Sequence, residues 1–240
     1  MYYYSKHTSF TEKEINTICE QFFKIFPKSV LESAYENFSW GKVKSSDEAI
    51  NVRNGIYKQF SAWANSGSLQ KNADEQIQKV HKWGFGRNLD KRESILLEEP
   101  YLTSFIDMIR NWQISEDPKK MLTKLETCLL TPYVKIARFS KWICFIDQSK
   151  YAIYDSRVSL ALRNILLNEK RVFPTLGARS KGRPNGDFIS TDSQVSAKKV
   201  AAIYMVYLDM LHTTIQEYNF SSVAQMEMAL FMLGTEQKYW

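Results

Sequence analysis

The sequence predicts a protein that is wholly or mainly α-helical, and three observations support this fold class. Apolar residues recur at helical spacing along most of the chain, capping residues stand before several of these segments, and no convincing run of alternating apolar and polar residues indicates a sheet. The chain has 240 residues and 44% of them are hydrophobic, which is enough to build one compact unit or two lobes.

Start and stop signals divide the chain into helices. Thr11 and Glu14 form a capping box, Pro100 marks a kink or a boundary, and Gly234 ends the last segment. We expect helices over residues 12–26, 29–38, 45–64, 74–83, 94–112, 118–130, 135–146, 156–167, 196–217 and 223–233.

Composition excludes several classes of protein. The first ten residues do not resemble a signal peptide, and charged residues break every long apolar run, so we expect an intracellular protein without a membrane span. The three cysteines (Cys19, Cys128 and Cys144) are scattered at apolar helical positions, and the three histidines are isolated. We therefore expect buried thiols, no metal site and no cofactor.

The positive charge is concentrated in one stretch of the chain. Residues 133–186 contain eleven Lys or Arg and three acidic residues, whereas the whole chain has a net charge of +6. Such a local excess is typical of proteins that bind a phosphate backbone. A solvated, charged surface would give the same composition.

Asp155 stands directly before the segment Ser156–Leu160, in the position of a helix N-cap. Aspartate is a favoured cap, and most aspartates in that position only cap. The positive end of the helix dipole also favours a charged carboxylate there.

The stretch from Leu130 to Ile165 has a distinctive layout. An apolar helix ends at Asp147, a loop follows, and the pair Ile153-Tyr154 leads into Asp155 and a new helix. This layout resembles the core of the helix-hairpin-helix DNA glycosylases, of the 8-oxoguanine glycosylase and endonuclease III type. The spacing of Asp147 and Asp155 is similar to that between the end of the second hairpin helix and the catalytic aspartate of the family.

The resemblance implies a fold and a mechanism. It implies two helical lobes, residues 1–40 with 168–240 and residues 41–167, with a helix-hairpin-helix element and a cleft between them. It implies that Asp155 stabilises the positive charge on the sugar as the base leaves and directs the attacking water. The scattered cysteines exclude the iron–sulfur cluster that some members carry.

Two departures from the family pattern affect this interpretation. The stretch Leu130–Val134, where the family has a glycine-rich turn that holds a phosphate, contains no glycine. The register also places Ile136 where bifunctional members have a nucleophilic lysine, with Lys135 one residue away. We therefore favour a monofunctional enzyme that uses water, while a Schiff base through Lys135 stays open.

Further residues are candidates for contact with DNA. In the loop 83–88, Trp83 and Phe85 could stack on an extruded base, and Arg87 or Asn88 could fill the gap that the base leaves in the duplex. Alternatively, the loop is a helix C-cap with two buried aromatic residues. Tyr133 and Tyr154 could line the base pocket or pack in the core. The expected backbone contacts are Arg138, Lys141 and Arg157, with Arg179, Lys181 and Arg183 in a basic loop that is either a DNA-binding element or disordered.

The sequence therefore predicts a monomeric DNA glycosylase. It would flip a modified or damaged base out of double-stranded DNA and hydrolyse the N-glycosidic bond, leaving an abasic site, in base-excision repair or in defence against modified foreign DNA. The alternatives are a non-catalytic helical protein that binds nucleic acid, in which Asp155 only caps its helix, and a helical interaction module.

Overall fold

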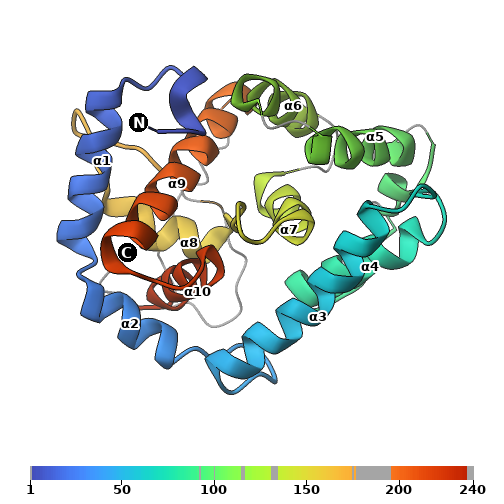
Figure 1. Ribbon diagram of the computed structural model, residues 1–240, viewed down its shortest axis with the longest axis horizontal. Helices are drawn as coiled ribbons and strands as arrows, with labels where there is room; N and C mark the ends of the chain where they lie inside the picture. Colours follow the sequence, from blue (N-terminus) through green and yellow to red (C-terminus); the bar gives the residue numbers. More distant parts are fainter. Residues whose placement is uncertain are drawn as a thin grey trace.

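The protein is helical, as the sequence predicts (Figure 1). The computed structural model describes residues 2–91, 93–99, 101–114, 117–130, 135–174, 176 and 196–236. The α-helices in this part are α1 (Glu12–Ile25), α2 (Lys28–Glu36), α3 (Ser46–Ala64), α4 (Ala73–Phe85), α5 (Tyr101–Ile114), α6 (Pro118–Leu130), α7 (Ile136–Ile146), α8 (Ser156–Ala161), α9 (Ala197–Tyr218) and α10 (Val223–Leu233). Short 3-10 helices η1 (Ser5–His7), η2 (Glu93–Leu97) and η3 (Leu162–Asn164) and one antiparallel hairpin, β1 (Leu166–Leu167) with β2 (Lys170–Arg171), complete it.

Local capping rules explain where several helices begin. Thr11 and Glu14 form the predicted capping box at the start of α1. The hydroxyl groups of Ser45 and Ser222 accept hydrogen bonds from backbone N–H groups in the first turns of α3 and α10. Each bond satisfies a donor that has no partner within the helix, so these starts are fixed by neighbouring residues alone.

Two helix boundaries differ from the prediction, and a third agrees with one of two predicted alternatives. The segment 94–112 was expected to have a kink or a boundary at its proline, and in the structure η2 ends at Leu97 and α5 begins at Tyr101. α4 continues to Phe85, and Gly86 ends it in the left-handed region at φ 70°. α8 ends at Ala161 instead of about residue 167, and a hairpin follows whose turn residues, Asn168 and Glu169, both have positive φ.

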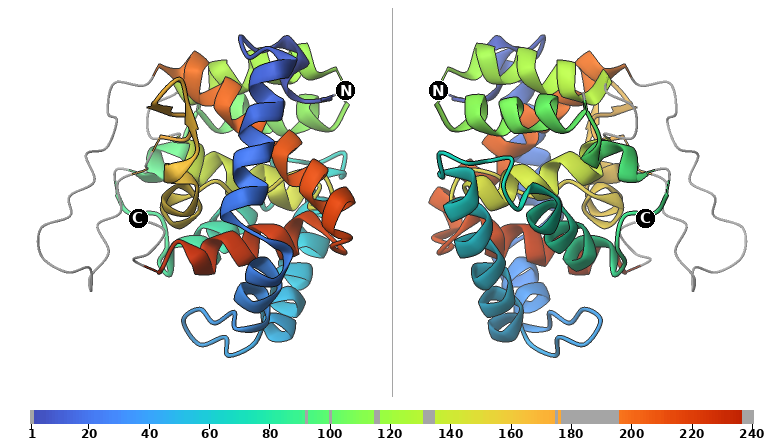
Figure 2. Two further views of the ribbon diagram at one scale, coloured as in Figure 1. Left: turned by 90° about the vertical axis from the view of Figure 1, so that its left-hand side faces the viewer. Right: turned by 90° about the vertical axis from the view of Figure 1, so that its right-hand side faces the viewer.

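α7 is the central element of the molecule (Figure 1). Nine of its eleven residues are buried, and it contacts α3, α4 and α5. α3 and α4 lie side by side, while α9 packs against α1 and α6, and α10 packs against α2, α8 and α9 (Figures 1 and 2). One contiguous hydrophobic core joins these groups of helices. The position of α7 is therefore fixed by helices packed on several of its sides.

Gly234, which ends α10 as predicted, allows a close approach between two helices. A Cβ atom added at this position would lie 2.0 Å from the carbonyl oxygen of Arg157 in α8. Its φ of −66° is open to any residue, so the requirement for glycine here is one of space. The contact sets how close α10 comes to the start of α8, where Asp155 lies.

Candidate functional site

Asp155 lines a cavity of about 440 Å³, which we call the Asp155 cavity. Its wall is built from α3, α4, α7, α8, α10 and the connection between α2 and α3. The size lies within the range of small-molecule sites in proteins, about 300–1,000 Å³. The aromatic lining residues are Phe38, Trp40, Trp83, Phe85 and Phe231, and the charged ones are Arg53, Lys141, Asp155, Arg157 and Glu227.

Exposed apolar side chains gather at this cavity. Five large hydrophobic residues are exposed in the described part of the chain, and Trp40, Val52 and Phe85 among them line the Asp155 cavity. Exposed apolar surface that surrounds a cavity marks binding sites more often than isolated exposed residues do. The rim of the cavity is therefore suited to a partner with flat apolar faces.

The segment before Asp155 is buried backbone that side chains from two helices, α7 and α9, hold in place. Ser140 accepts a hydrogen bond from the Tyr154 N–H, and Tyr204 and Tyr207 donate their hydroxyls to the carbonyl oxygens of Ala152 and Ile153. Buried backbone groups need such partners because they cannot reach water. These bonds fix the position from which α8 begins and thereby aim the Asp155 carboxylate.

The two oxygens of the Asp155 carboxylate have different partners. Oδ1 accepts hydrogen bonds from the N–H groups of Arg157 and Val158, at 3.0 and 3.2 Å, and so caps α8. Oδ2 lies 3.4 Å from Nζ of Lys141. The side chain of Asp155 is 16% exposed, so the carboxylate is accessible from the cavity while one of its oxygens is held by the helix.

Lys141 is a buried lysine in the wall of the cavity. Its side chain is only 4% exposed, and its Nζ donates to the Ala137 carbonyl oxygen at 3.2 Å and lies 4.8 Å from the centre of the Phe85 ring. Gly84 makes room for the aliphatic part of the side chain, since a Cβ there would lie 2.4 Å from Lys141 Cδ. α4 and α7 therefore hold this amine beside Asp155.

Arg157, in the first turn of α8, lies over two aromatic rings that also contact each other. Its guanidinium carbon lies 4.3 Å from the centre of the Trp40 ring and 4.6 Å from that of Phe231. Trp40 belongs to a tight turn in which it pairs with Val43 and Gly41 has a φ of 62°. A cation over an aromatic face is attracted by the ring quadrupole, so this stack holds the turn against the mouth of the cavity.

A buried carboxylate, Glu93, supports the Phe85 side of the cavity. Arg87 donates to both of its oxygens, at 2.6 and 3.0 Å, and Arg138 donates to Oε1. Burial alone would raise the pKa of Glu93, but the hydrogen bonds from Arg87 and from the Asp90 N–H, together with the charge of Arg138, hold that pKa at about 2. His81 stacks on Phe85 and lies 3.7 Å from Glu93, which extends the cluster to α4.

A second ion pair lies deeper in the wall of the cavity. Arg53 of α3 and Glu227 of α10 approach to 2.6 Å, with side chains 2% and 5% exposed. Arg53 also donates to Cys144 Sγ, and Glu227 accepts from the N–H of Ile153. Burial raises the pKa of Glu227, against the opposing effect of Arg53, and the nearby charge of Asp155 raises it further.

The structure brings some of the predicted site residues together and separates others. Asp155, Lys141, Arg157, Trp83 and Phe85 line one cavity.

Lys135 is an exposed residue before the start of α7, and Arg87 and Asn88 are exposed beyond the end of α4; none of the three lines the Asp155 cavity. Tyr154 is buried in the core, where its hydroxyl donates to the Pro174 carbonyl oxygen.

The three described basic residues that we expected to contact phosphates each have a partner within the protein. Arg138 is bonded to Glu93, Lys141 lies beside Asp155, and Arg157 is stacked on aromatic rings. Tyr133, Arg179, Lys181 and Arg183 lie outside the described residues, as does most of the stretch that corresponds to the family's glycine-rich turn.

Sequence reasoning missed several groups in the cavity. It did not select Arg53, Glu227 or Trp40, and it treated Lys141 as a phosphate contact. A signal for Lys141 was present, because the five residues that follow it, Trp142–Ile146, are all apolar and indicate that this part of α7 is buried. Arg53 and Glu227 stand far apart in the chain, and nothing local to either indicates the other.

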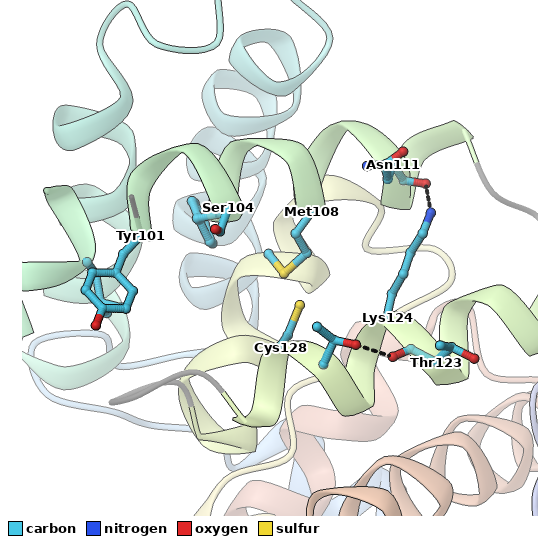
Figure 3. Close-up of a pocket in the computed structure, with 10 residues that line it drawn as sticks. Tyr101, Ser104, Met108, Asn111, Thr123, Lys124 and Cys128 are labelled. Atoms are coloured by element: carbon cyan, nitrogen blue, oxygen red, sulfur yellow. Dashed lines mark hydrogen bonds between the residues drawn. The ribbon is translucent and has the colours of Figure 1, made fainter. Parts of the chain in front are cut away.

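A second cavity, of about 300 Å³, lies between α5 and α6 (Figure 3). Met108 and Cys128 face each other across it, and Lys124 of α6 donates to the Asn111 carbonyl oxygen of α5 at 3.0 Å. We call it the α5–α6 pocket. No carboxylate is among the described residues that line it.

Comparisons with known proteins found no match, so the site is interpreted from its geometry alone. The chain matched no protein-family model, no curated protein and no solved structure. Among the helices that the structure describes, none has the length and apolar character needed to cross a membrane. Among all the residues that the structure describes, no group of three or more His, Cys, Asp or Glu side chains is placed to hold a metal ion.

Proposed function

We propose that this protein is a DNA N-glycosylase of the helix-hairpin-helix type, which removes a modified or damaged base from double-stranded DNA. The observation that supports this most strongly is the arrangement of Asp155. One oxygen of this carboxylate caps α8, and the other faces an amine in a cavity with aromatic walls.

The chemistry of base removal needs a fixed negative charge. As the N-glycosidic bond breaks, the base takes the bonding electron pair and positive charge builds on the sugar. A carboxylate that is already oriented stabilises this charge without reorganisation. The two N–H groups that bind Asp155 Oδ1 supply that orientation.

The cavity is also suited to a base that has left the double helix. Enzymes that act on bases in duplex DNA extrude the nucleotide and stack its base between apolar or aromatic side chains. Trp40 and Phe85 stand at the rim, 44% and 38% exposed, and each has a cation over its ring. Aromatic faces with adjacent positive charge favour a planar base attached to a phosphate backbone.

Two routes of attack are compatible with this pair of side chains. In the first, water forms the new bond to C1′ and its proton passes to the departing base. In the second, the amine of Lys141, after it has given up a proton, bonds to C1′ as the base leaves with the electron pair of the N-glycosidic bond. The C1′–O4′ bond then breaks, O4′ takes up a proton and an open-chain Schiff base forms, from which water later releases the lysine. The distance of 3.4 Å from Asp155 supports Lys141, rather than Lys135, as the lysine for the second route.

In this proposal the enzyme acts as an intracellular monomer, in base-excision repair or in defence against DNA with modified bases. The competing function is non-catalytic binding of nucleic acid, in which Asp155 is only a cap. The two differ in one measurable respect, because only an enzyme releases bases.

The test separates the charge of Asp155 from its capping role. Asparagine caps helices as well as aspartate does, so Asp155→Asn should keep the cap of α8 and lose base release by roughly 100-fold or more. Because it also removes the counter-charge of the buried Lys141, some loss of stability is expected. Asp155→Ala should lose activity and about 1 kcal/mol more stability than Asp155→Asn, because it also removes the cap.

Base release would be measured on duplex oligonucleotides that each contain one modified base. If wild-type protein releases none of them, or if Asp155→Asn releases them at the wild-type rate, the protein is not a glycosylase that works through Asp155.

A further inference from the structure

The Asp155 cavity is larger than a nucleobase requires. Its volume is about 440 Å³, and protein cavities of roughly 300–1,000 Å³ enclose ligands of drug size, which are larger than a bare base. Protein interiors are close-packed, so a hollow of this size is unusual unless something binds in it. The cavity therefore has room for a base and for a further group attached to that base.

The cavity has two parts with different linings. In the first part, the amine of Lys141 lies 4.8 Å from the centre of the Phe85 ring. In the second part, the guanidinium of Arg157 lies 4.6 Å from the centre of the Phe231 ring. Asp155 stands between the two, because one of its oxygens faces Lys141 and the other accepts from the Arg157 N–H. The cavity therefore extends from the proposed reacting groups toward Phe231.

The second part is an apolar compartment, which we call the Phe231 compartment. Phe38, Ala49 and Met228 form a small hydrophobic cluster that is separate from the main core, and Val43 and Phe231 pack against it. All five residues line the Asp155 cavity. A separate cluster around a hollow provides an apolar wall that the main core does not need for its own packing.

The charged residues near the compartment leave its accessible wall mainly apolar. Arg53 and Glu227 belong to the wall, but their side chains are only 2% and 5% exposed and bond to each other. The guanidinium of Arg157 lies over the rings of Trp40 and Phe231. A surface of this kind favours apolar groups, because each buried CH₂ group strengthens binding by about fourfold.

We infer that the Phe231 compartment holds a bulky aromatic group attached to the base, so that the enzyme selects bases that carry such an adduct. This inference rests on the glycosylase function proposed above. The rings of Phe38 and Phe231, whose centres are 5.8 Å apart, and the adaptable thioether of Met228 suit an aromatic group. The adduct leaves together with the base, so the bonds that form and break are those already described.

The test compares bases that differ only in the attached group. Duplexes would contain adenine with a methyl or a benzyl group on N6, or with a benzyl group on C8, because N6 and C8 lie on different edges of the base. We expect kcat/KM for release of at least one benzyl base to exceed that for N6-methyladenine by roughly 10- to 100-fold. Release of modified bases without a preference for either benzyl base would overturn the inference and leave the glycosylase function intact.

A binding measurement covers the case in which no base is released. The wild-type protein would be titrated by calorimetry with 2′-deoxyadenosine and with its N6-benzyl and 8-benzyl derivatives. Binding of a benzyl nucleoside at least about 10-fold more tightly than 2′-deoxyadenosine would support the compartment even if the proposed reaction fails. Equal binding of all three, or binding of none, would refute it.

Substitutions that fill the compartment provide a second readout. Val43→Phe adds a ring from the turn before α3, and Ala49→Leu adds a branched side chain from α3 itself. Either change should reduce the preference for the benzyl base by at least about 10-fold, because the added side chain takes the place of the adduct. The matched control is Asn51→Phe, which places the same ring on the exposed face of α3, outside the lining of the cavity. A preference that is unchanged in both filled variants, when circular dichroism shows them folded, would contradict the inference.

Discussion

The two cavities described here have similar apolar walls but different chemistry. Each contains a lysine held by a backbone carbonyl oxygen, Lys141 bonded to Ala137 and Lys124 bonded to Asn111. In the Asp155 cavity a carboxylate from a different helix lies beside the lysine, whereas the α5–α6 pocket has no carboxylate among its described lining residues (Figure 3).

Burial acts on both cavities, but it produces a reactive arrangement only where charges converge. Burial raises the pKa of Cys128 in the α5–α6 pocket to about 12, so this thiol stays protonated and is a poor nucleophile. The Asp155 cavity has five charged lining residues, which are Arg53 of α3, Lys141 of α7, Arg157 of α8, Glu227 of α10, and Asp155, which caps α8. The comparison shows that hydrophobic enclosure alone does not distinguish a candidate active site from a packing defect.

The largest expected effect comes from exchanging the two lysines for methionine. Lys141→Met removes the amine beside Asp155 and should reduce base release by roughly 100- to 1,000-fold, whereas Lys124→Met keeps the stem that lines the α5–α6 pocket and should leave activity unchanged. The measurement is single-turnover base release. Borohydride trapping on the same substrates shows which route operates, because only the Schiff-base route gives a covalent complex.

Two outcomes would contradict the comparison between the lysines. Equal loss of activity in both variants would mean that the α5–α6 pocket takes part in the reaction. A covalent complex that still forms in Lys141→Met but no longer forms in Lys135→Met would identify Lys135, the lysine considered from the sequence, as the nucleophile.

A smaller effect is expected from the carboxylate that supports the rim. Glu93→Gln leaves Arg138 and Arg87 without their shared counter-charge and should destabilise the protein by roughly 2–3 kcal/mol at pH 7. The matched control is Asp107→Asn on α5, whose ion pair with Arg110 is exposed and should contribute less than about 0.5 kcal/mol. Denaturant unfolding measures both.

The pH dependence of this effect has a definite sign. The pKa of Glu93 is about 2 in the folded protein against 4.5 ordinarily, so its stabilising contribution is complete above pH 4.5 and disappears as the pH falls to about 2. The difference in unfolding free energy between wild type and Glu93→Gln should follow the same course. A difference that is constant from pH 7 to pH 3 would show that Glu93 acts through packing rather than charge.

Much of the fold was predictable from local signals. The capping box of Thr11 and Glu14 and the glycine after α10 define helix ends through residues a few positions apart, and the structure confirms them. The hairpin after α8 was missed because its turn residues, Asn168 and Glu169, have positive φ without a glycine to indicate it.

The candidate site was less accessible to sequence reasoning, for a physical reason. Asp155 could be found because an aspartate before a helix is a local pattern. Lys141 reaches it through packing between α4 and α7, and Arg53 and Glu227 meet only because α3 and α10 line one cavity. Such contacts depend on the tertiary arrangement, which a single sequence does not specify.

The smallest effect, and the most selective one, is expected from a single methyl group. In Gly84→Ala the new Cβ would lie 2.4 Å from Lys141 Cδ and 2.7 Å from Cε, so the lysine side chain must move away from its present position. A displacement of about 1 Å at reacting groups can cost up to 100-fold in rate, and we expect a loss of roughly 10-fold in base release with little change in stability. The control is Gly55→Ala in α3, where no atom lies within 4 Å of the added Cβ and alanine should stabilise the helix by up to about 1 kcal/mol. If Gly84→Ala keeps full activity, the position of the Lys141 amine beside Asp155 does not limit the reaction, and the difference between the two cavities is reduced to the carboxylate alone.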